Sequence, residues 1–118
     1  MMVDQALLRE RILETVNMII ALEGGPVPVV EVRVVTAPAF FDSTFGTSLL
    51  TEDGHVVMRV AVQRPGKDVA DTILHETAHV LLGPDHIDQP DHGLNFQNTY
   101  RRIRDKYFDV VLEEVTRP

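Results

Sequence analysis

Hydrophobic residues recur every three to four positions in three stretches of the chain, and this spacing predicts three helices. The first runs from about Val3 to Glu23 and ends at a Gly-Gly-Pro sequence. The second begins near Asp68, whose side chain can cap it, and ends at about Leu82, before a Gly-Pro pair. The third runs from about Leu94 to Glu114. It carries apolar or aromatic residues at helical spacing, namely Phe96, Tyr100, Ile103, Tyr107 and Val110.

Two further stretches are rich in β-branched residues and predict strands. In Val29–Thr36 valines alternate with charged residues, and His55–Gln63 follows an Asp-Gly turn. Between them, Phe40–Asp53 is rich in turn residues, so we expect a loop, either packed by its own aromatic side chains or forming one wall of a cleft. The strand His55–Gln63 is either a core strand or an edge strand with which an extended substrate pairs. The order of elements predicts an α+β fold.

Composition and charge narrow the possible functions. A chain of 118 residues with 44% hydrophobic residues fits one domain, spanning residues 1–118, with a single core. The formal net charge of -7 argues against broad electrostatic binding to nucleic acid or anionic membranes. The absence of cysteine excludes disulfides, thiolate zinc sites and a cysteine nucleophile. With no signal-peptide pattern and no apolar run long enough to span a bilayer, we expect a cytoplasmic location and no membrane partner.

A short basic run lies on the last predicted helix. It consists of Arg101, Arg102, Arg104 and Lys106. The simplest interpretation is a solvated helix face, and the alternative is a contact with nucleic acid or an acidic substrate.

The second predicted helix carries the sequence His75-Glu76-Thr77-Ala78-His79 in its second half. Residues four apart lie on the same face of a helix, so both imidazoles can reach one metal ion. Glu76 is directed about 100° away around the same turn, where its carboxylate can reach a water on that metal without being a ligand. This is the HExxH arrangement of zinc hydrolases. It makes His75 and His79 candidate ligands of Zn²⁺ and Glu76 a candidate catalytic base.

A catalytic zinc usually has three protein ligands and one open position. The downstream candidates for the third ligand are Asp85, His86, Asp88, Asp91 and His92. Of these, His92 begins the sequence His92-Gly93-Leu94-Asn95-Phe96 at the start of the third helix. At this point the chain resembles the SprT-like zinc metalloproteases. In that family HExxH is followed, after a short loop, by a His-Gly-x-x-Phe or His-Gly-x-x-Trp segment that carries the third ligand.

The resemblance implies a zincin-like α+β fold, in which a small sheet packs with an N-terminal helix, the HExxH helix and a C-terminal helix. It also implies that His75, His79 and His92 bind Zn²⁺ and that Glu76 is the general base. Three neutral imidazoles leave the zinc dipositive, which lowers the pKa of a bound water toward neutrality. Glu76 would take a proton from this water for attack on a carbonyl and later pass the proton to the leaving amine.

The expected partner is a protein or peptide substrate. Larger SprT-like proteins add a cysteine zinc ribbon or DNA-binding tails, neither of which is present in this sequence, and members that act on DNA-crosslinked proteins rely on such contacts. The net charge disfavours nucleic acid as a binding partner, whereas the family resemblance leaves such binding open. The side chain that stabilises the oxyanion is not determined, and Tyr100 and His55 are both candidates.

Two alternatives stay open. With His86 as third ligand, HETAHVLLGPDH looks like the HExxHxxGxxH signature of metzincins, and its end looks like the LGYDH of YbeY-type endoribonucleases. Gly83 and His86 each fall one residue too late for these patterns. HETAHVLL is also similar to the ImmA/IrrE peptidases. The second alternative is a non-catalytic, zinc-stabilised binding module, although purely structural zinc sites are usually four-coordinate and cysteine-rich.

Overall fold

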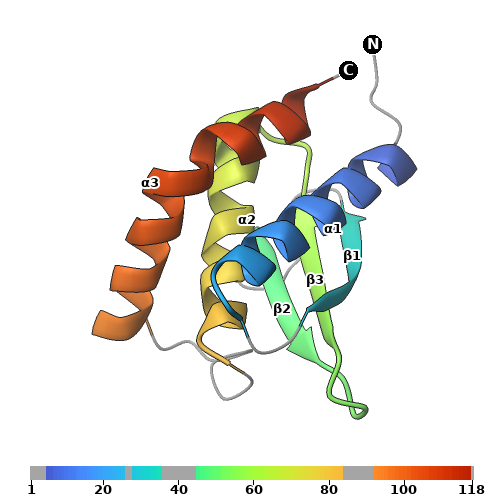
Figure 1. The fold of residues 1–118 in the computed structure, drawn as a ribbon. Coiled ribbons are helices and arrows are strands. Elements are labelled where there is room, and N and C mark those ends of the chain that lie inside the picture. The colour runs from blue at the N-terminus through green and yellow to red at the C-terminus, as the bar shows by residue number, and fades with distance from the viewer. Residues whose placement is uncertain (1–4, 26–27, 36–44, 84–91, 118) are drawn as a thin grey trace.

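The computed structural model describes residues 5–25, 28–35, 45–83 and 92–117, which form three helices and a small sheet of three strands (Figure 1). The elements follow the order α1 (Gln5–Leu22), β1 (Val29–Val35), β2 (Gly46–Leu50), β3 (Val56–Ala61), α2 (Gly66–Leu81) and α3 (Leu94–Thr116). The α+β prediction is confirmed. The described helix ends lie within about two residues of the predicted ones because the apolar period is unambiguous in all three helices.

The sheet has the strand order β1-β3-β2, so β3 is its central strand. β1 pairs with β3 in parallel, and β2 pairs with β3 in antiparallel orientation. Of the two alternatives for this segment, the central strand is confirmed, and the edge strand with which a substrate would pair is wrong. β2 lies within Phe40–Asp53, where we predicted a loop, and this prediction is wrong for Gly46–Leu50. Glycine has low strand propensity, and the pairing of β2 with β3 overrides it.

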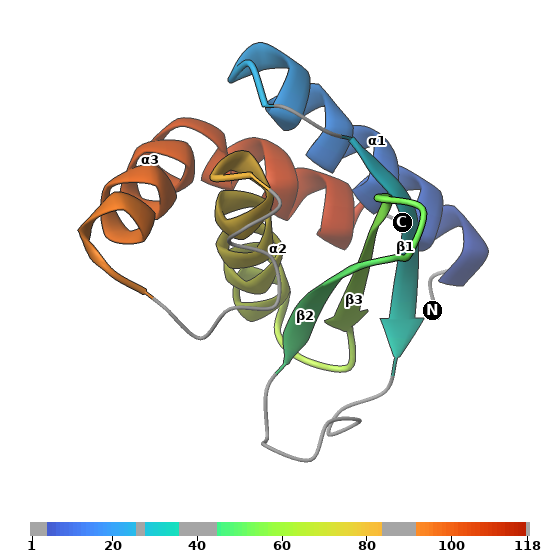
Figure 2. The same cartoon turned by 90° about the horizontal axis from the view of Figure 1, so that it is seen from below.

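α1 and α2 cover one face of the sheet, and α3 packs against both of them on the side away from the strands (Figure 2). The core lies between these layers. Its largest fully buried side chains include Ile12, Ile19, Val32, Met58, Val60, Ile73, Leu74 and Ile103. Each of these contributes about 1.5–3 kcal/mol through burial. Among the helices in the described ranges, none is both long and apolar enough to cross a lipid bilayer.

The two ends of α2 are set by backbone geometry. Its N-cap residue is Pro65, and no side chain caps the helix, so the prediction that Asp68 is the cap is wrong. Asp68 instead lies in the first turn, where its negative charge interacts favourably with the helix dipole. After Leu81 the chain reaches Gly83 with a φ of 101°, a left-handed conformation that favours glycine and ends the helix.

A buried carboxylate connects α1 with α3. The side chain of Glu23, which follows α1, is 7% exposed. Glu23 Oε1 accepts a hydrogen bond from Arg102 Nε at 3.0 Å, and Oε2 accepts from Lys106 Nζ at 3.1 Å and from the Tyr107 hydroxyl at 2.8 Å. Arg104 pairs with an acidic residue of α2. Three of the four basic residues in the predicted run on α3 thus have acidic partners within this chain, which favours a packing role over an external acidic partner.

Replacing Glu23 with glutamine should lower the free energy of unfolding by about 2 kcal/mol at pH 7, because charged donors lose their acceptor charge. The hydrogen bonds from Tyr107, Lys106 and Arg102 lower the pKa of Glu23 below 4.5, although its burial acts in the opposite direction. A carboxyl with a lowered folded-state pKa stabilises the fold above its unfolded-state pKa, and this stabilisation is lost as the pH falls through the folded-state value. Urea unfolding should therefore show that the difference in free energy of unfolding between wild type and Glu23→Gln shrinks below pH 4.5.

The control is Glu31→Gln, which removes an exposed ion pair on β1 and should lower the free energy of unfolding by less than about 0.5 kcal/mol. An equal loss of stability in the two variants would contradict the role given to Glu23.

Candidate metal centre

Three histidines, two from α2 and one from the segment just before α3, converge between these two helices. His75 and His79 lie one turn apart on α2, and His92 lies two residues before the start of α3. Each offers one ring nitrogen, and these nitrogens all lie within 4.8 Å of one another. The ring centroids are 5.1 Å apart for His75 and His79, 4.9 Å for His75 and His92, and 5.1 Å for His79 and His92. The structure thus brings together all three residues that the motifs predict, and the cluster could hold a metal ion.

The chemistry of the cluster fits Zn²⁺, for which three imidazoles are an established catalytic ligand set. The cluster is graded in exposure: His79 is 6% exposed, His75 is half-buried and His92 is exposed. Burial first, and the nearby His92 second, lower the pKa of His75 below its usual 6.5. The His75 imidazole is therefore neutral at pH 7, and metal binding requires that form.

Phe96 packs against all three imidazoles from the first turn of α3. Its side chain is 3% exposed, and its ring centroid lies 4.9 Å from that of His75, 4.4 Å from that of His79 and 4.7 Å from that of His92. This is the aromatic residue of the His-Gly-x-x-Phe segment. Its ring packs the start of α3 against the face of α2 that carries His75 and His79.

A polar contact joins the same two helices next to the cluster. Tyr100 stacks on Phe96 with the ring centroids 5.9 Å apart, and its hydroxyl donates a hydrogen bond to Asp71 of α2. The Asp71 carboxylate also accepts from Arg104 Nε at 3.2 Å. Burial, together with the Asp71 carboxylate, raises the pKa of Tyr100 to about 12. The Tyr100 hydroxyl therefore stays protonated and ties α3 to α2.

The two oxyanion candidates differ in their surroundings. Tyr100 lies beside the cluster, with its ring centroid 5.7 Å from that of His75, and its hydroxyl is bonded to a carboxylate. His55 is exposed in the turn between β2 and β3 and is not part of the histidine cluster. The alternative third ligand, His86, lies outside the described residues, as do the acidic candidates Asp85, Asp88 and Asp91.

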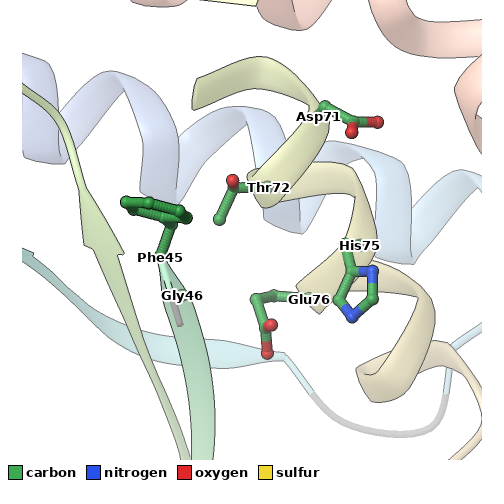
Figure 3. Close-up of a pocket in the computed structure, with 6 residues that line it drawn as sticks. All are labelled: Phe45, Gly46, Asp71, Thr72, His75 and Glu76. Carbon is green, nitrogen blue, oxygen red and sulfur yellow. The ribbon is translucent and has the colours of Figure 1, made fainter. Parts of the chain in front are cut away.

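Glu76 points from α2 toward β2, beside His75 (Figure 3). Its side chain is 6% exposed, and its Oε1 accepts a hydrogen bond from Ser48 Oγ at 2.9 Å. Glu76 and His75 line the same pocket of about 270 Å³. The other lining residues are Phe45, Gly46, Asp71 and Thr72. The carboxylate of the motif and one of its histidines thus reach one cavity from neighbouring positions on α2.

Two small residues of β2 make this arrangement possible, and our sequence analysis did not identify either of them. A Cβ atom on Gly46 would lie 2.5 Å from Cγ2 of Thr72 and 3.3 Å from Cγ of Glu76, so glycine allows β2 to approach α2 closely. Ser48, two residues later on the same face of β2, reaches Glu76. The only signal in the sequence is the two-residue spacing of these small side chains, and the turn-like composition of the segment obscures it.

Comparison of the chain with protein-family models, curated proteins and solved structures gives no match. The fold and the site themselves define the class: this is an α+β protein with a three-histidine cluster beside a buried glutamate.

Proposed function

We propose that this protein is a zinc-dependent metallopeptidase with a zincin-like fold, most similar to the SprT-like family. The observation that carries the proposal is the convergence of His75, His79 and His92, with Glu76 in the pocket that His75 also lines. A chance HExxH sequence has no reason to be completed by a third histidine from a separate segment of the chain, just before α3. The substrate class that fits an open pocket at the border of a sheet is a protein or peptide.

The chain's own residues divide the work of hydrolysis. When bound, zinc supplies Lewis acidity that polarises the scissile carbonyl and makes water more acidic. His75, His79 and His92 would hold the ion. Glu76 would take a proton from the attacking water and transfer it to the leaving nitrogen, so that the carbon–nitrogen bond breaks and a carboxylic acid and an amine are released. β2 borders the sheet beside the pocket, so an extended substrate would pair with β2 rather than with β3.

Zinc content measured by elemental analysis tests the ligand set. After equilibration with zinc and removal of excess metal, wild type should hold about one zinc per chain, and His92→Ala should hold less than about 0.2. His86→Ala and the exposed control His55→Ala should match wild type. Loss of zinc in His86→Ala instead would favour a metzincin- or YbeY-like hydrolase, and wild type without zinc would refute the proposal. Zinc binding without hydrolysis of any peptide by wild type would favour the non-catalytic binding module.

A further inference from the structure

A side chain from the sheet contacts the glutamate of the HExxH motif. Ser48 Oγ lies 2.9 Å from Glu76 Oε1, with the hydroxyl donating to the carboxylate. The two side chains are 3% and 6% exposed, so water competes little for this hydrogen bond. We propose that Ser48 is a positioning residue, which fixes the carboxylate of Glu76 in the orientation that proton transfer requires. The inference rests on the proposed function, in which Glu76 is the catalytic base.

The contact follows because residues on one face of β2 and residues on one face of α2 are spaced by similar distances along the two elements. Gly46 and Ser48 lie two residues apart on one face of β2, and Thr72 and Glu76 lie four residues apart on one face of α2. Two residues advance a strand by about 6.7 Å, and four residues advance a helix by about 6 Å. Gly46 therefore lies against Thr72 where Ser48 lies against Glu76. The close approach at Gly46 brings the serine hydroxyl within reach of the carboxylate.

Both sides of this contact are held by other bonds. Ser48 pairs with the fully buried Met58 in the ladder between β2 and β3. On α2, the Thr72 hydroxyl donates to the carbonyl oxygen of Asp68 at 3.0 Å and accepts from Arg64 Nη1 at 3.0 Å. Because β2 and α2 are each fixed, the serine hydroxyl has a fixed position relative to the helix. A glutamate side chain has several rotatable bonds, and a fixed donor selects one arrangement of them.

This selection has a specific consequence for the reaction. A general base works only within about 2.6–3.2 Å of the proton that it takes, and a misplacement of about 1 Å can cost about 100-fold in rate. Without the Ser48 hydroxyl, the Glu76 carboxylate would lose a donor that selects its orientation, and a smaller fraction of molecules would be competent. Ser48 does not line the pocket, so its loss should lower kcat and leave KM almost unchanged.

Kinetics of the zinc-loaded protein test the positioning role. We would use an internally quenched fluorescent peptide, selected as the best wild-type substrate from a mixed library. Ser48→Ala should lower kcat about tenfold, with KM within about twofold of wild type and zinc content unchanged. Ser48→Thr, which keeps the hydroxyl, should restore kcat to within about threefold. Thr116→Ala, which removes a hydroxyl that donates to the carbonyl oxygen of Leu112 in the last turn of α3, should leave kcat within about twofold.

Two further measurements separate the role of Ser48 from the proposed function. In the Glu76→Gln background, Ser48→Ala should change the residual rate by less than about twofold, because Ser48 acts through Glu76. In NMR spectra of the zinc-loaded protein, the Hβ–Hγ coupling constants of Glu76, which depend on χ2, should report one rotamer in wild type and Ser48→Thr, and rotamer averaging in Ser48→Ala. A single rotamer in Ser48→Ala would overturn the inference. If wild type cleaves no peptide, the proposed function fails, and the coupling constants still decide whether Ser48 orients Glu76.

Discussion

Replacing Glu76 with glutamine is expected to lower the rate of peptide hydrolysis by about 1,000-fold while about one zinc per chain stays bound. Glutamine has the shape of glutamate, and its side-chain carbonyl can still accept the hydrogen bond from Ser48. An amide is not basic at neutral pH, so it cannot take the proton of the attacking water. The expected result is thus a folded, zinc-loaded protein without a functional base. Hydrolysis of the fluorescent peptide and elemental analysis of the same samples measure both quantities.

The control for this experiment is Glu14→Gln, which changes an exposed glutamate on α1 and should leave the rate within about twofold of wild type. Full activity in Glu76→Gln would mean that another group is the base. Loss of zinc together with activity would assign Glu76 to the integrity of the metal site and would contradict its role as a base. Only loss of activity with zinc retained agrees with the proposal.

Removing zinc by chelation should lower the midpoint of thermal unfolding by about 15 °C. An ion that binds only the folded chain stabilises it by about 4 kcal/mol when free ion exceeds its Kd by 1,000-fold. In a chain of this length each kcal/mol corresponds to about 4 °C. The expected stabilisation is large because two of the proposed ligands lie on α2 and the third lies just before α3, so a bound ion would cross-link α2 to the start of α3. Circular dichroism melts with added zinc and with chelator give the two midpoints.

The variant His92→Ala should remove this difference, because it detaches α3 from the ion. Its midpoint should be about the same with zinc and with chelator. The exposed histidine variant His55→Ala should keep the full wild-type response. An unchanged wild-type midpoint on chelation would show that zinc contributes nothing to the folded state and would argue against a site of this affinity.

The sequence predicts the helices and the pair His75 and His79 because both depend on local spacing. The apolar period defines α1, α2 and α3, and a spacing of four places His75 and His79 on one face. His92 is predicted from a motif rather than from a period, and the structure brings its ring next to the other two because Phe96 packs the start of α3 against α2. These features need few residues to specify them.

The features that could not be predicted depend on how distant elements are placed. Gly46–Leu50 becomes a strand through its pairing with β3, and its own composition favours a turn. The hydrogen bond from Ser48 to Glu76 joins residues 28 apart, and the bond from Tyr100 to Asp71 joins residues 29 apart. No pattern within one element reports such contacts. A carboxylate or hydroxyl that is unremarkable in the sequence acquires its partner only when the sheet and the helices are assembled.

The attachments of α3 lie at different points along the helix, and this has a consequence for its local opening. Glu23 holds the middle of α3 through Arg102, Lys106 and Tyr107, at a distance from the histidine cluster. The first turn of α3 is held by Phe96 and would be held further by a bound ion. We therefore expect amide hydrogens in the middle of α3 to exchange only when the whole molecule opens. The amides that donate to carbonyl oxygens at the start of α3, beginning with the Gln97 N–H bonded to Gly93, should exchange through local fraying of the first turn. Hydrogen exchange in that turn would act as a built-in reporter of whether the histidines hold a metal.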